Sequence, residues 1–311
     1  MPYISVRGVD HYYEWIRSEN QTEAKPAMVF VHGWGGSARY WESTAKAMSD
    51  CFDCLLYDMR GFGRSTKSRN GETRTISETE SVIQAESELV KDTPKTAAEL
   101  TYELESFADD LAALLEALNL NRVYINAHSM GASVATFFIN RYPEKVERAI
   151  LTCSGIFEYD EKAFAAFHKF GGYVVKYRPR WLQKIPFADK FFMARFLHRP
   201  LPSVISKAFL EDFLLADYDA ALGTIFTSVS KQAAEVMPQE FAKITVPTLI
   251  VSGEYDQIIP AAMGRQAADL SDRAEYALIR NTAHFPMLED AETYLQRVQE
   301  FLGVNCQFAV K

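Results

Sequence analysis

The sequence predicts an α/β fold in which helices cover a mostly parallel sheet. Short apolar runs recur along the chain, and they are typical of strands that are buried on both faces. Helical patterns separate these runs, which indicates helical crossovers between parallel strands. The alternation stops near residue 156 and returns at residue 247. We therefore expect a core of residues 1–155 and 241–311, with a mostly helical insertion at residues 156–240.

The expected elements follow from these patterns in chain order. The alternating run at residues 3–16 contains a glycine turn and predicts an antiparallel hairpin, and the apolar run at residues 28–31 predicts a buried strand. A helix at residues 129–142 is expected to stop before Pro143, because proline does not continue a helix. Further strands are expected at residues 52–59, 122–127, 148–153, 247–251 and 274–279. Further helices are expected at residues 40–48, 98–118, 261–270 and 291–301.

The composition excludes several classes of protein. Of 311 residues, 48% are hydrophobic and 24% are charged, which is too apolar for a mostly disordered chain. The net charge of −8 opposes sequence-independent binding to nucleic acid. No stretch approaches the roughly 18 apolar residues that span a bilayer, and residues 1–7 lack the layout of a signal peptide. We expect a cytoplasmic protein with no nucleic-acid partner, and make no prediction of its oligomeric state.

The four cysteines, at positions 51, 54, 153 and 306, are too few for a disulfide scaffold. Cys51 and Cys54 have the spacing of a redox or zinc pair, but no second pair or histidine cluster follows at metal spacing. Free cysteine is commonly buried. We therefore expect the cysteines to pack in the interior, with a redox or zinc site as the alternative.

The polar stretch at residues 66–96 is rich in Glu, Ser and Thr. Within it, residues 77–90 fit a surface helix in which Ser77 is the N-cap and Glu80 occupies the reciprocal capping position. We expect a solvated acidic loop. The alternative is a flap close to a functional site.

Ser129 lies where a predicted strand runs directly into a predicted helix. A serine on such a tight turn needs small residues two positions to either side, and Ala127 and Gly131 provide them. The turn lifts the hydroxyl above the sheet. It also places the Met130 amide at a helix N-terminus, where it can meet a developing negative charge.

A serine nucleophile needs a base, and the base needs a carboxylate to orient it. His284 follows the strand expected at residues 274–279. Asp256 follows the strand expected at residues 247–251, with Glu254 as its rival for the role of acid. Open α/β sheets bind ligands at the carboxyl ends of their strands, and serine–acid–histidine is a known chain order for a triad. We therefore expect Ser129, Asp256 and His284 to meet.

The glycine-rich loop at residues 32–36 follows the first buried strand and exposes backbone donors for an oxyanion. We expect the Trp34 amide to act with the Met130 amide. His32 and His128 are expected to be structural, His128 also being a candidate for the pocket. The side chains expected to line the substrate pocket are Trp34, His128, Phe157 and Phe285.

Together, five motifs resemble the α/β-hydrolase superfamily. They lie at residues 32–35, 58–65, 127–131, 253–256 and 283–285. The resemblance implies an eight-stranded, mostly parallel sheet with helices on both faces and a helical cap between the sixth and seventh strands. It also implies that Ser129 is the nucleophile, Asp256 the acid and His284 the base, and that residues 58–65 form a structural turn.

The sequence departs from the superfamily pattern at two places. Ala127 replaces the first glycine of the usual G-x-S-x-G motif, which is similar to some small bacterial lipases. The stretch at residues 66–96 is longer than the usual link. Epoxide hydrolases and haloalkane dehalogenases of this superfamily carry aspartate at the nucleophile position, so Ser129 argues against both.

The first half of the insertion is basic and aromatic. Residues 160–199 contain nine Lys and Arg against three Asp and Glu, with ten Phe, Tyr and Trp among them. Such a surface can rest on an anionic membrane. In the alternative, which we favour on sequence alone, the aromatic rings pack the cap onto the sheet and the charged ends stay solvated. A cap over a catalytic serine normally forms the pocket walls, so we expect an apolar pocket.

These observations predict a serine hydrolase that cleaves esters of lipophilic acyl or alcohol groups through an acyl-enzyme, with no cofactor and no metal. The same residues would also serve C–C bond hydrolysis, thioester hydrolysis, acyl transfer or cofactor-free haloperoxidase chemistry, and fold-level analogy does not separate these reactions. A third alternative is a ligand-binding protein that retains the scaffold without catalysis.

Overall fold

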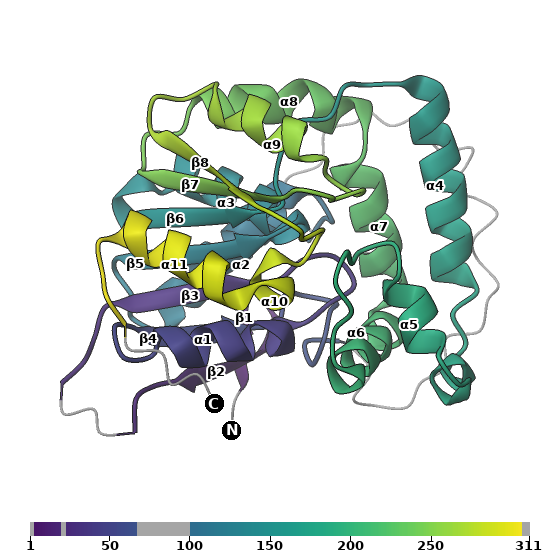
Figure 1. The fold of residues 1–311 in the computed structure, drawn as a ribbon, viewed down its shortest axis with the longest axis horizontal. Helices are drawn as coiled ribbons and strands as arrows, with labels where there is room; N and C mark the ends of the chain where they lie inside the picture. Colours follow the sequence, from purple (N-terminus) through teal and green to yellow (C-terminus); the bar gives the residue numbers. More distant parts are fainter. Residues whose placement is uncertain (1–2, 20–22, 67–99, 307–311) are drawn as a thin grey trace.

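Eight strands form one sheet (Figure 1). The structure is a computed structural model, and it describes residues 3–19, 23–66 and 100–306. In chain order the strands are β1 (Tyr3–Val6), β2 (Val9–Ile16), β3 (Ala27–Val31), β4 (Asp53–Tyr57), β5 (Val123–His128), β6 (Val146–Thr152), β7 (Thr248–Gly253) and β8 (Ala274–Ile279). Their order in the sheet is β1-β2-β4-β3-β5-β6-β7-β8. Only the pairs β1–β2 and β2–β4 are antiparallel, so the predicted mostly parallel, eight-stranded α/β sheet is confirmed.

Helices cover both faces of the sheet, which is why the central strand β3 is apolar and buried at every position. In β3, Val29 and Val31 face one cluster of buried side chains, whereas Met28 and Phe30 face another. The first cluster includes side chains of α2 (Leu104–Ala117), α3 (Met130–Arg141), α8 (Lys231–Ala242) and α9 (Ala261–Ala268). The second includes side chains of α1 (Glu42–Met48) and α11 (Ala291–Leu302). The sheet therefore forms the middle of three layers, with helices packed on each of its faces (Figure 1).

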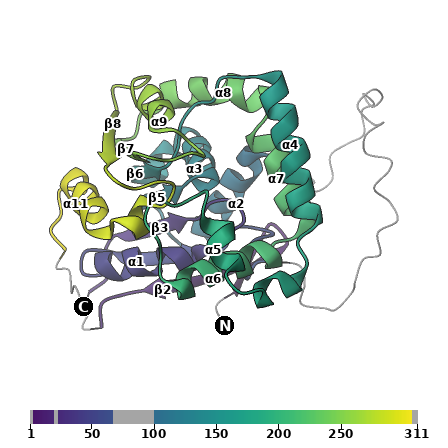
Figure 2. The same ribbon diagram turned by 45° about the vertical axis from the view of Figure 1, so that its right-hand side comes forward.

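The segment between β6 and β7 is helical, as expected. Besides α8 it contains α4 (Glu161–Lys176), η3 (Arg180–Lys184), α5 (Ala188–Met193), α6 (Ser203–Leu215) and α7 (Tyr218–Ser228). Figures 1 and 2 show α4 to α7 beyond the carboxyl ends of the strands, with α4 on the outer side. We call α4 to α7 the cap. The division of the chain at residues 156 and 240 stays a prediction.

Some elements begin or end elsewhere than the sequence predicts. The helix expected at residues 98–118 begins only at Leu104, because Glu103 is extended. The helix expected at residues 40–48 starts as a 3₁₀ turn, η1 (Ala38–Trp41), in which the Ser37 hydroxyl accepts a hydrogen bond from the Arg39 amide. β4 stops at Tyr57, and the chain then turns. The helix expected at residues 77–90 lies outside the described residues.

A disulfide joins Cys51 to Cys306, whose Cα atoms are 5.6 Å apart. The prediction that all the cysteines simply pack in the interior is therefore wrong for these two, and Cys51 does not pair with Cys54. The chain beyond α11 returns to the turn that follows α1, which a local spacing pattern does not reveal. Cys54 and Cys153 are free and buried. Disulfides are typical of oxidising compartments, so the cytoplasmic location stays a prediction. In the part of the chain that the structure describes, no helix could span a bilayer.

Candidate active site

Ser129 occupies the sharp turn between β5 and α3. Its φ of 55° and ψ of −125° are unfavourable for a residue with a side chain and mark a strained turn. The turn also fits closely against the loop after β3. A Cβ atom at Gly131 would lie 2.3 Å from the His32 carbonyl oxygen, and one at Gly33 would lie 3.1 Å from the Ser129 Cβ. The small residues therefore let the serine turn and the glycine loop meet backbone to backbone.

Three side chains from three turns form one chain of hydrogen bonds. The Ser129 hydroxyl donates to His284 Nε2 over 3.0 Å, and His284 Nδ1 donates to Asp256 Oδ2 over 2.8 Å. Asp256 follows β7, whereas His284 lies between β8 and the short helix α10 (Pro286–Glu289). Asp256 and His284 are buried, while Ser129 is half-buried. The structure thus brings together the three residues that the sequence placed at strand ends.

Asp256 is held as a carboxylate. Its Oδ1 accepts hydrogen bonds from the amides of Ile258 at 2.8 Å and Ile259 at 3.1 Å. Burial alone would raise the pKa of Asp256, but the adjacent His284 and these two amides outweigh it and lower the pKa below its usual range. A charged carboxylate accepts a hydrogen bond from the N–H group of His284 Nδ1. The opposite nitrogen, Nε2, is then free to accept the serine proton.

The rival acid, Glu254, points elsewhere. It is exposed, and its carboxylate accepts a hydrogen bond from the Asn281 amide at 2.9 Å. This contact fastens the turn after β8 to the turn after β7. Glu254 therefore supports the loop that carries the histidine, and among the described residues its carboxylate has no hydrogen bond to the imidazole.

Two backbone amides beside Ser129 lack acceptors. In the described ranges, neither the Trp34 amide nor the Met130 amide donates to a protein group. Met130 is the first residue of α3, where helical amides have no partner in the helix. Trp34 follows Gly33, whose close contact with Ser129 brings its loop to the serine. Both amides can therefore serve as donors to an oxygen anion that forms near Ser129 Oγ.

His32 links two loops near the site. Its Nδ1 donates to the Gly33 carbonyl at 2.8 Å, and its Nε2 accepts from the Met59 amide at 2.8 Å. Burial lowers the pKa of His32, which keeps the ring neutral, as an acceptor at Nε2 requires. It holds the glycine loop against the turn at residues 58–65, in keeping with its expected structural role.

His128 holds the backbone of the histidine loop. Its Nε2 donates to the His284 carbonyl at 2.7 Å, and its Nδ1 accepts from the Tyr40 hydroxyl at 3.0 Å. The same hydroxyl accepts a hydrogen bond from the Gly33 amide. Burial lowers the pKa of His128 well below its ordinary value. One neutral imidazole and one phenol therefore connect the glycine loop to the loop of His284.

The four expected pocket residues do not share one surface. The Trp34 indole donates to the Ala221 carbonyl of α7 at 2.9 Å, and its ring packs against Phe213 of α6. His128 and Phe285 are buried, with their ring centroids 4.7 Å apart. Phe157 lines a separate cavity of about 400 Å³ beside α8, whose lining includes none of the three hydrogen-bonded residues. The pocket assignments of all four stay predictions.

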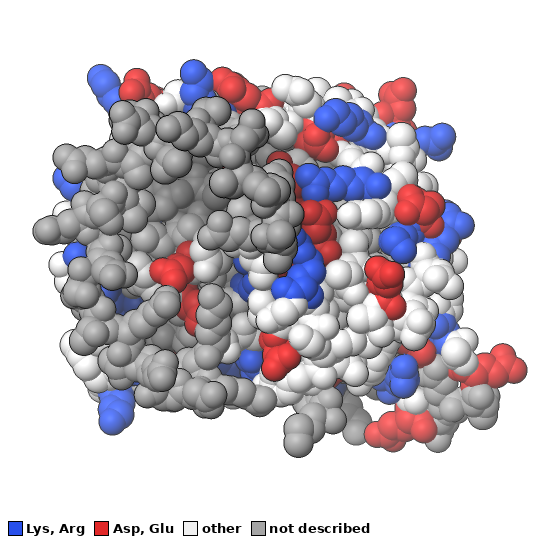
Figure 3. All heavy atoms as spheres, turned by 180° about the vertical axis from the view of Figure 1, so that it is seen from behind, with Lys and Arg blue, Asp and Glu red and all other residues white. Residues whose placement is uncertain are grey.

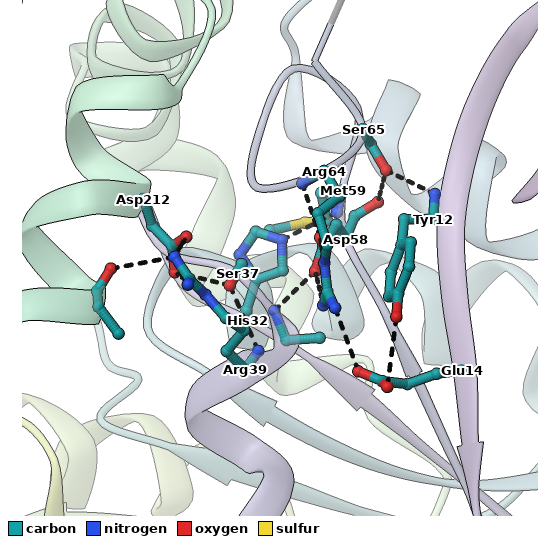
Figure 4. A network of polar contacts seen from close by, with 12 residues as sticks. Tyr12, Glu14, His32, Ser37, Arg39, Asp58, Met59, Arg64, Ser65 and Asp212 are labelled. Atoms are coloured by element: carbon teal, nitrogen blue, oxygen red, sulfur yellow. Dashed lines mark hydrogen bonds and ion pairs between the residues drawn. The ribbon is translucent and has the colours of Figure 1, made fainter. Parts of the chain in front are cut away.

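The structure reveals a polar network of which the sequence motifs indicated only the part at residues 58–65 (Figure 4). Asp212 of α6 accepts hydrogen bonds from the Ser37 hydroxyl at 2.6 Å and from the Arg39 guanidinium. Asp58 accepts from the amides of Ala38 and Arg64, each at 2.8 Å. The network fastens the cap to the loop after the glycine-rich segment. Only the Asp–Arg spacing at residues 58–64 was visible in sequence, because Asp212 lies more than 170 positions from its partners.

Cap residues also touch the base. The His284 amide donates to the Phe196 carbonyl at 2.9 Å, and the two rings lie 6.0 Å apart. Phe196 follows α5. The cap therefore forms one wall around the imidazole, a contact for which the sequence carried no signal beyond its aromatic content.

One group of metal-binding residue types lies within the site. One ligand atom each of His128, Cys153 and His284 lies within 4.8 Å of the others. The four ring nitrogens already have hydrogen-bond partners, namely Tyr40, a carbonyl, Ser129 and Asp256. Burial raises the pKa of the Cys153 thiol well above its ordinary value, so the sulfur stays protonated and a poor ligand. The hydrogen bonds thus account for this grouping.

Known proteins share this architecture. A family model described as alpha/beta hydrolase fold matches residues 26–291. The uncharacterized hydrolase YugF of Bacillus subtilis is 23% identical over 306 residues, or 96% of each chain. The non-heme chloroperoxidase CPO-A1 of Kitasatospora aureofaciens is 25% identical over 317 residues, which cover 97% of this chain and 100% of that protein. The solved structure of an esterase from Exiguobacterium antarcticum has a TM-score of 0.72 at 18% identity and covers 97% of this chain and 99% of its own.

The family model covers strands β3 to β8, the cap and all three turns that meet at Ser129. The mostly parallel sheet and the strained serine turn between β5 and α3 agree with this family assignment. The chain belongs to the α/β-hydrolase family.

Proposed function

We propose that this protein is a serine hydrolase that cleaves carboxylic esters of lipophilic acyl or alcohol groups. The observation that carries the proposal is the unbroken chain of hydrogen bonds from the Ser129 hydroxyl through His284 to Asp256. This arrangement is the one that activates a serine hydroxyl for attack on a carbonyl. The esterase from Exiguobacterium antarcticum, which has the same fold, supports the choice of reaction.

In the proposed mechanism, Ser129 Oγ attacks the ester carbonyl while its proton moves to His284 Nε2. Asp256 stabilises the resulting imidazolium, and the amides of Trp34 and Met130 donate to the oxyanion. One such donor contributes about 3 to 4 kcal/mol to the barrier reduction in known cases. When the tetrahedral intermediate collapses, His284 protonates the leaving alcohol. The imidazole then takes a proton from water, which attacks the acyl-enzyme. As this second tetrahedral intermediate collapses, His284 returns the proton to Ser129 Oγ, and the acid is released.

The preference for lipophilic groups rests on the aromatic surroundings of the serine. Trp34 and Phe213 pack together where the glycine loop meets the cap, and Phe196 lies beside the imidazole. Apolar walls with a few directed polar groups are typical of small-molecule sites. We infer that one side of the ester is held by this aromatic wall while the carbonyl meets the two amides.

The test replaces Ser129 with alanine and compares it with Ser133→Ala, a control with the same chemical change one turn further along α3. With p-nitrophenyl esters of increasing chain length, we expect Ser129→Ala to lower kcat by about 10⁴-fold or more and Ser133→Ala to retain activity. A fluorophosphonate probe should label every protein except Ser129→Ala. Undiminished ester hydrolysis by folded Ser129→Ala would overturn the proposal.

A second candidate is peroxide-dependent halogenation, which the chloroperoxidase relative from Kitasatospora aureofaciens supports by its name. Halogenation of monochlorodimedone with peroxide and halide, assayed beside the esters, an acyl-CoA and a diketone, separates the reaction classes. If no substrate turns over and the fluorophosphonate probe fails to label Ser129, a binding protein without catalysis is the better assignment.

A further inference from the structure

The cap exposes large aromatic rings. We call six of them the aromatic cap face, and their exposed fractions run from 53% for Tyr173 to 81% for Phe191. The six are Phe170, Tyr173, Tyr177, Trp181, Phe187 and Phe191. Rings of this size are usually buried, and a gathering of exposed ones marks a surface that contacts another apolar phase. The sequence-based expectation that the aromatic residues mainly pack the cap onto the sheet does not account for these six.

Helical spacing gives three of the rings a common direction. Phe170, Tyr173 and Tyr177 are three and four positions apart, so they follow one face at α4 and its C-terminal end. The opposite face holds the buried Gly171 and Val175 and packs on α7. In Figures 1 and 2, α4 lies on the side of the cap that is farthest from the sheet. These rings therefore point away from the proposed active site.

Positive charge flanks the rings. Lys162, Lys169 and Lys176 are spaced seven apart along α4, which places them in one row beside the aromatic stripe. Further basic residues continue along η3 and α5, namely Arg180, Lys184 and Lys190. Among the described residues none of these six forms a salt bridge with an acidic side chain. Lys190 instead lies 5.3 Å from the Phe187 ring centroid. By contrast, both signs of charge are interspersed over the coloured part of the rear view (Figure 3).

We propose that the aromatic cap face docks on an anionic membrane surface, a role independent of the proposed ester hydrolysis. Phe and Trp rings enter the boundary between headgroups and acyl chains, and the lysines meet lipid phosphates. Charge complementarity selects this partner. A second copy of the chain would oppose like charges across the same face. The exposed rings favour a partner with an apolar phase beneath its phosphates, which a bilayer has.

The experiment measures cosedimentation with vesicles of phosphatidylcholine alone and of phosphatidylcholine with 30% phosphatidylglycerol, without any ester substrate. The aromatic variant carries Phe170→Ala, Tyr177→Ala and Phe191→Ala, and the charge variant carries Lys169→Glu and Lys176→Glu. The matched control carries Leu270→Ala and Leu278→Ala, because both side chains are exposed and apolar but lie outside the cap. We expect wild type to bind anionic vesicles at least about 10-fold better than neutral ones. Both cap variants should lose at least 10-fold in affinity, and the control should lose none.

Trp181 gives a second readout, since its emission should shift to shorter wavelength on anionic vesicles and the Trp181→Phe variant should not show this shift. Circular dichroism and hydrolysis of a short soluble ester verify that each variant is folded. Equal affinity of wild type and the aromatic variant for anionic vesicles, or no binding by wild type, would overturn the proposal. A wild-type dimer that the aromatic variant abolishes would assign the face to a second copy instead. Because binding is measured without substrate, this result is separate from any failure of the ester assay.

Discussion

The turns around Ser129 and the outer face of the cap are built by different rules. Around Ser129, backbone meets backbone: a Cβ at Gly253 would lie 1.9 Å from the Ala283 carbonyl oxygen, and one at Gly131 would lie 2.3 Å from that of His32. On α4, a Cβ at Gly172 would meet only a Leu222 methyl at 3.9 Å. Residue identity is thus dictated by contact at the site, whereas the exposed face of α4 at Gly172 leaves room for a larger side chain, and the exposed rings of the cap need another explanation.

The largest expected effect tests which carboxylate belongs to the site. Asp256→Asn should lower kcat for ester hydrolysis by about 10⁴-fold, because an amide can hold the imidazole in the wrong tautomer and does not stabilise the imidazolium. Glu254→Gln is the control, since its amide oxygen can still accept from the Asn281 amide. Steady-state kinetics of both variants decide the matter. An equal loss of kcat in both variants would show that neither carboxylate orients the imidazole and that both residues only maintain the structure of the turn after β7.

Acid should destabilise the core through its buried neutral histidines. Burial lowers the pKa of His11, His32 and His128, so below pH 6.5 the unfolded chain binds protons that the folded chain does not. The free energy of unfolding therefore falls as pH falls, by up to about 4 kcal/mol per pH unit for three such groups. The loss extends from pH 6.5 down towards each folded pKa. Urea unfolding at pH 7.5, 6.5 and 5.5 measures it.

His11→Gln sharpens this test, because His11 lies on β2 and has no part in the proposed chemistry. This variant should lose about one third of the pH slope. His198→Asn, in the exposed part of the cap, is the control and should keep the wild-type slope. A free energy of unfolding that stays flat between pH 7.5 and 5.5 would contradict the prediction.

The core turns were predictable because their chemistry is local. Small residues on both sides of Ser129 signal the strained turn, and the predicted bounds of β8 agree with the structure. Asp256 and His284 could be placed because parallel strands end at the same edge of a sheet. The sequence left Glu254 open as a rival acid. The structure distinguishes the two, because the Asp256 carboxylate points to His284 and the Glu254 carboxylate points to the Asn281 amide.

Contacts between distant segments were not predictable. The Asp212–Arg39 contact and the Cys51–Cys306 disulfide join residues 173 and 255 positions apart, and neither leaves a periodic pattern in the sequence. The aromatic cap face was visible only as composition. The same rings would serve packing or docking, and burial alone distinguishes the two.

The disulfide should stabilise the edge of the core opposite the site. Cys51 lies two residues before the start of β4, so the bond lies at the amino end of that strand, whereas Ser129 lies at the carboxyl end of β5. Reduction should lower the free energy of unfolding by about 2 to 4 kcal/mol without changing kcat in the folded protein. Urea unfolding with and without a phosphine reductant measures this loss. The double variant Cys51→Ser with Cys306→Ser should be insensitive to the reductant, and an insensitive wild type would show that the bond contributes nothing.

The smallest expected effects come from one substitution at two helical glycines, and they carry opposite signs. Gly131→Ala forces a Cβ against the backbone of His32, so α3 or the glycine loop must shift. We expect a loss of about 1 to 3 kcal/mol in stability together with reduced kcat, because the Trp34 amide moves with the loop. Gly172→Ala meets only a methyl group, and alanine favours the helix, so stability should rise by about 0.5 to 1 kcal/mol at unchanged kcat. Thermal unfolding and ester kinetics of both variants test the pair. If the two substitutions acted alike, the contrast between a core held by backbone contact and a more tolerant cap would fail.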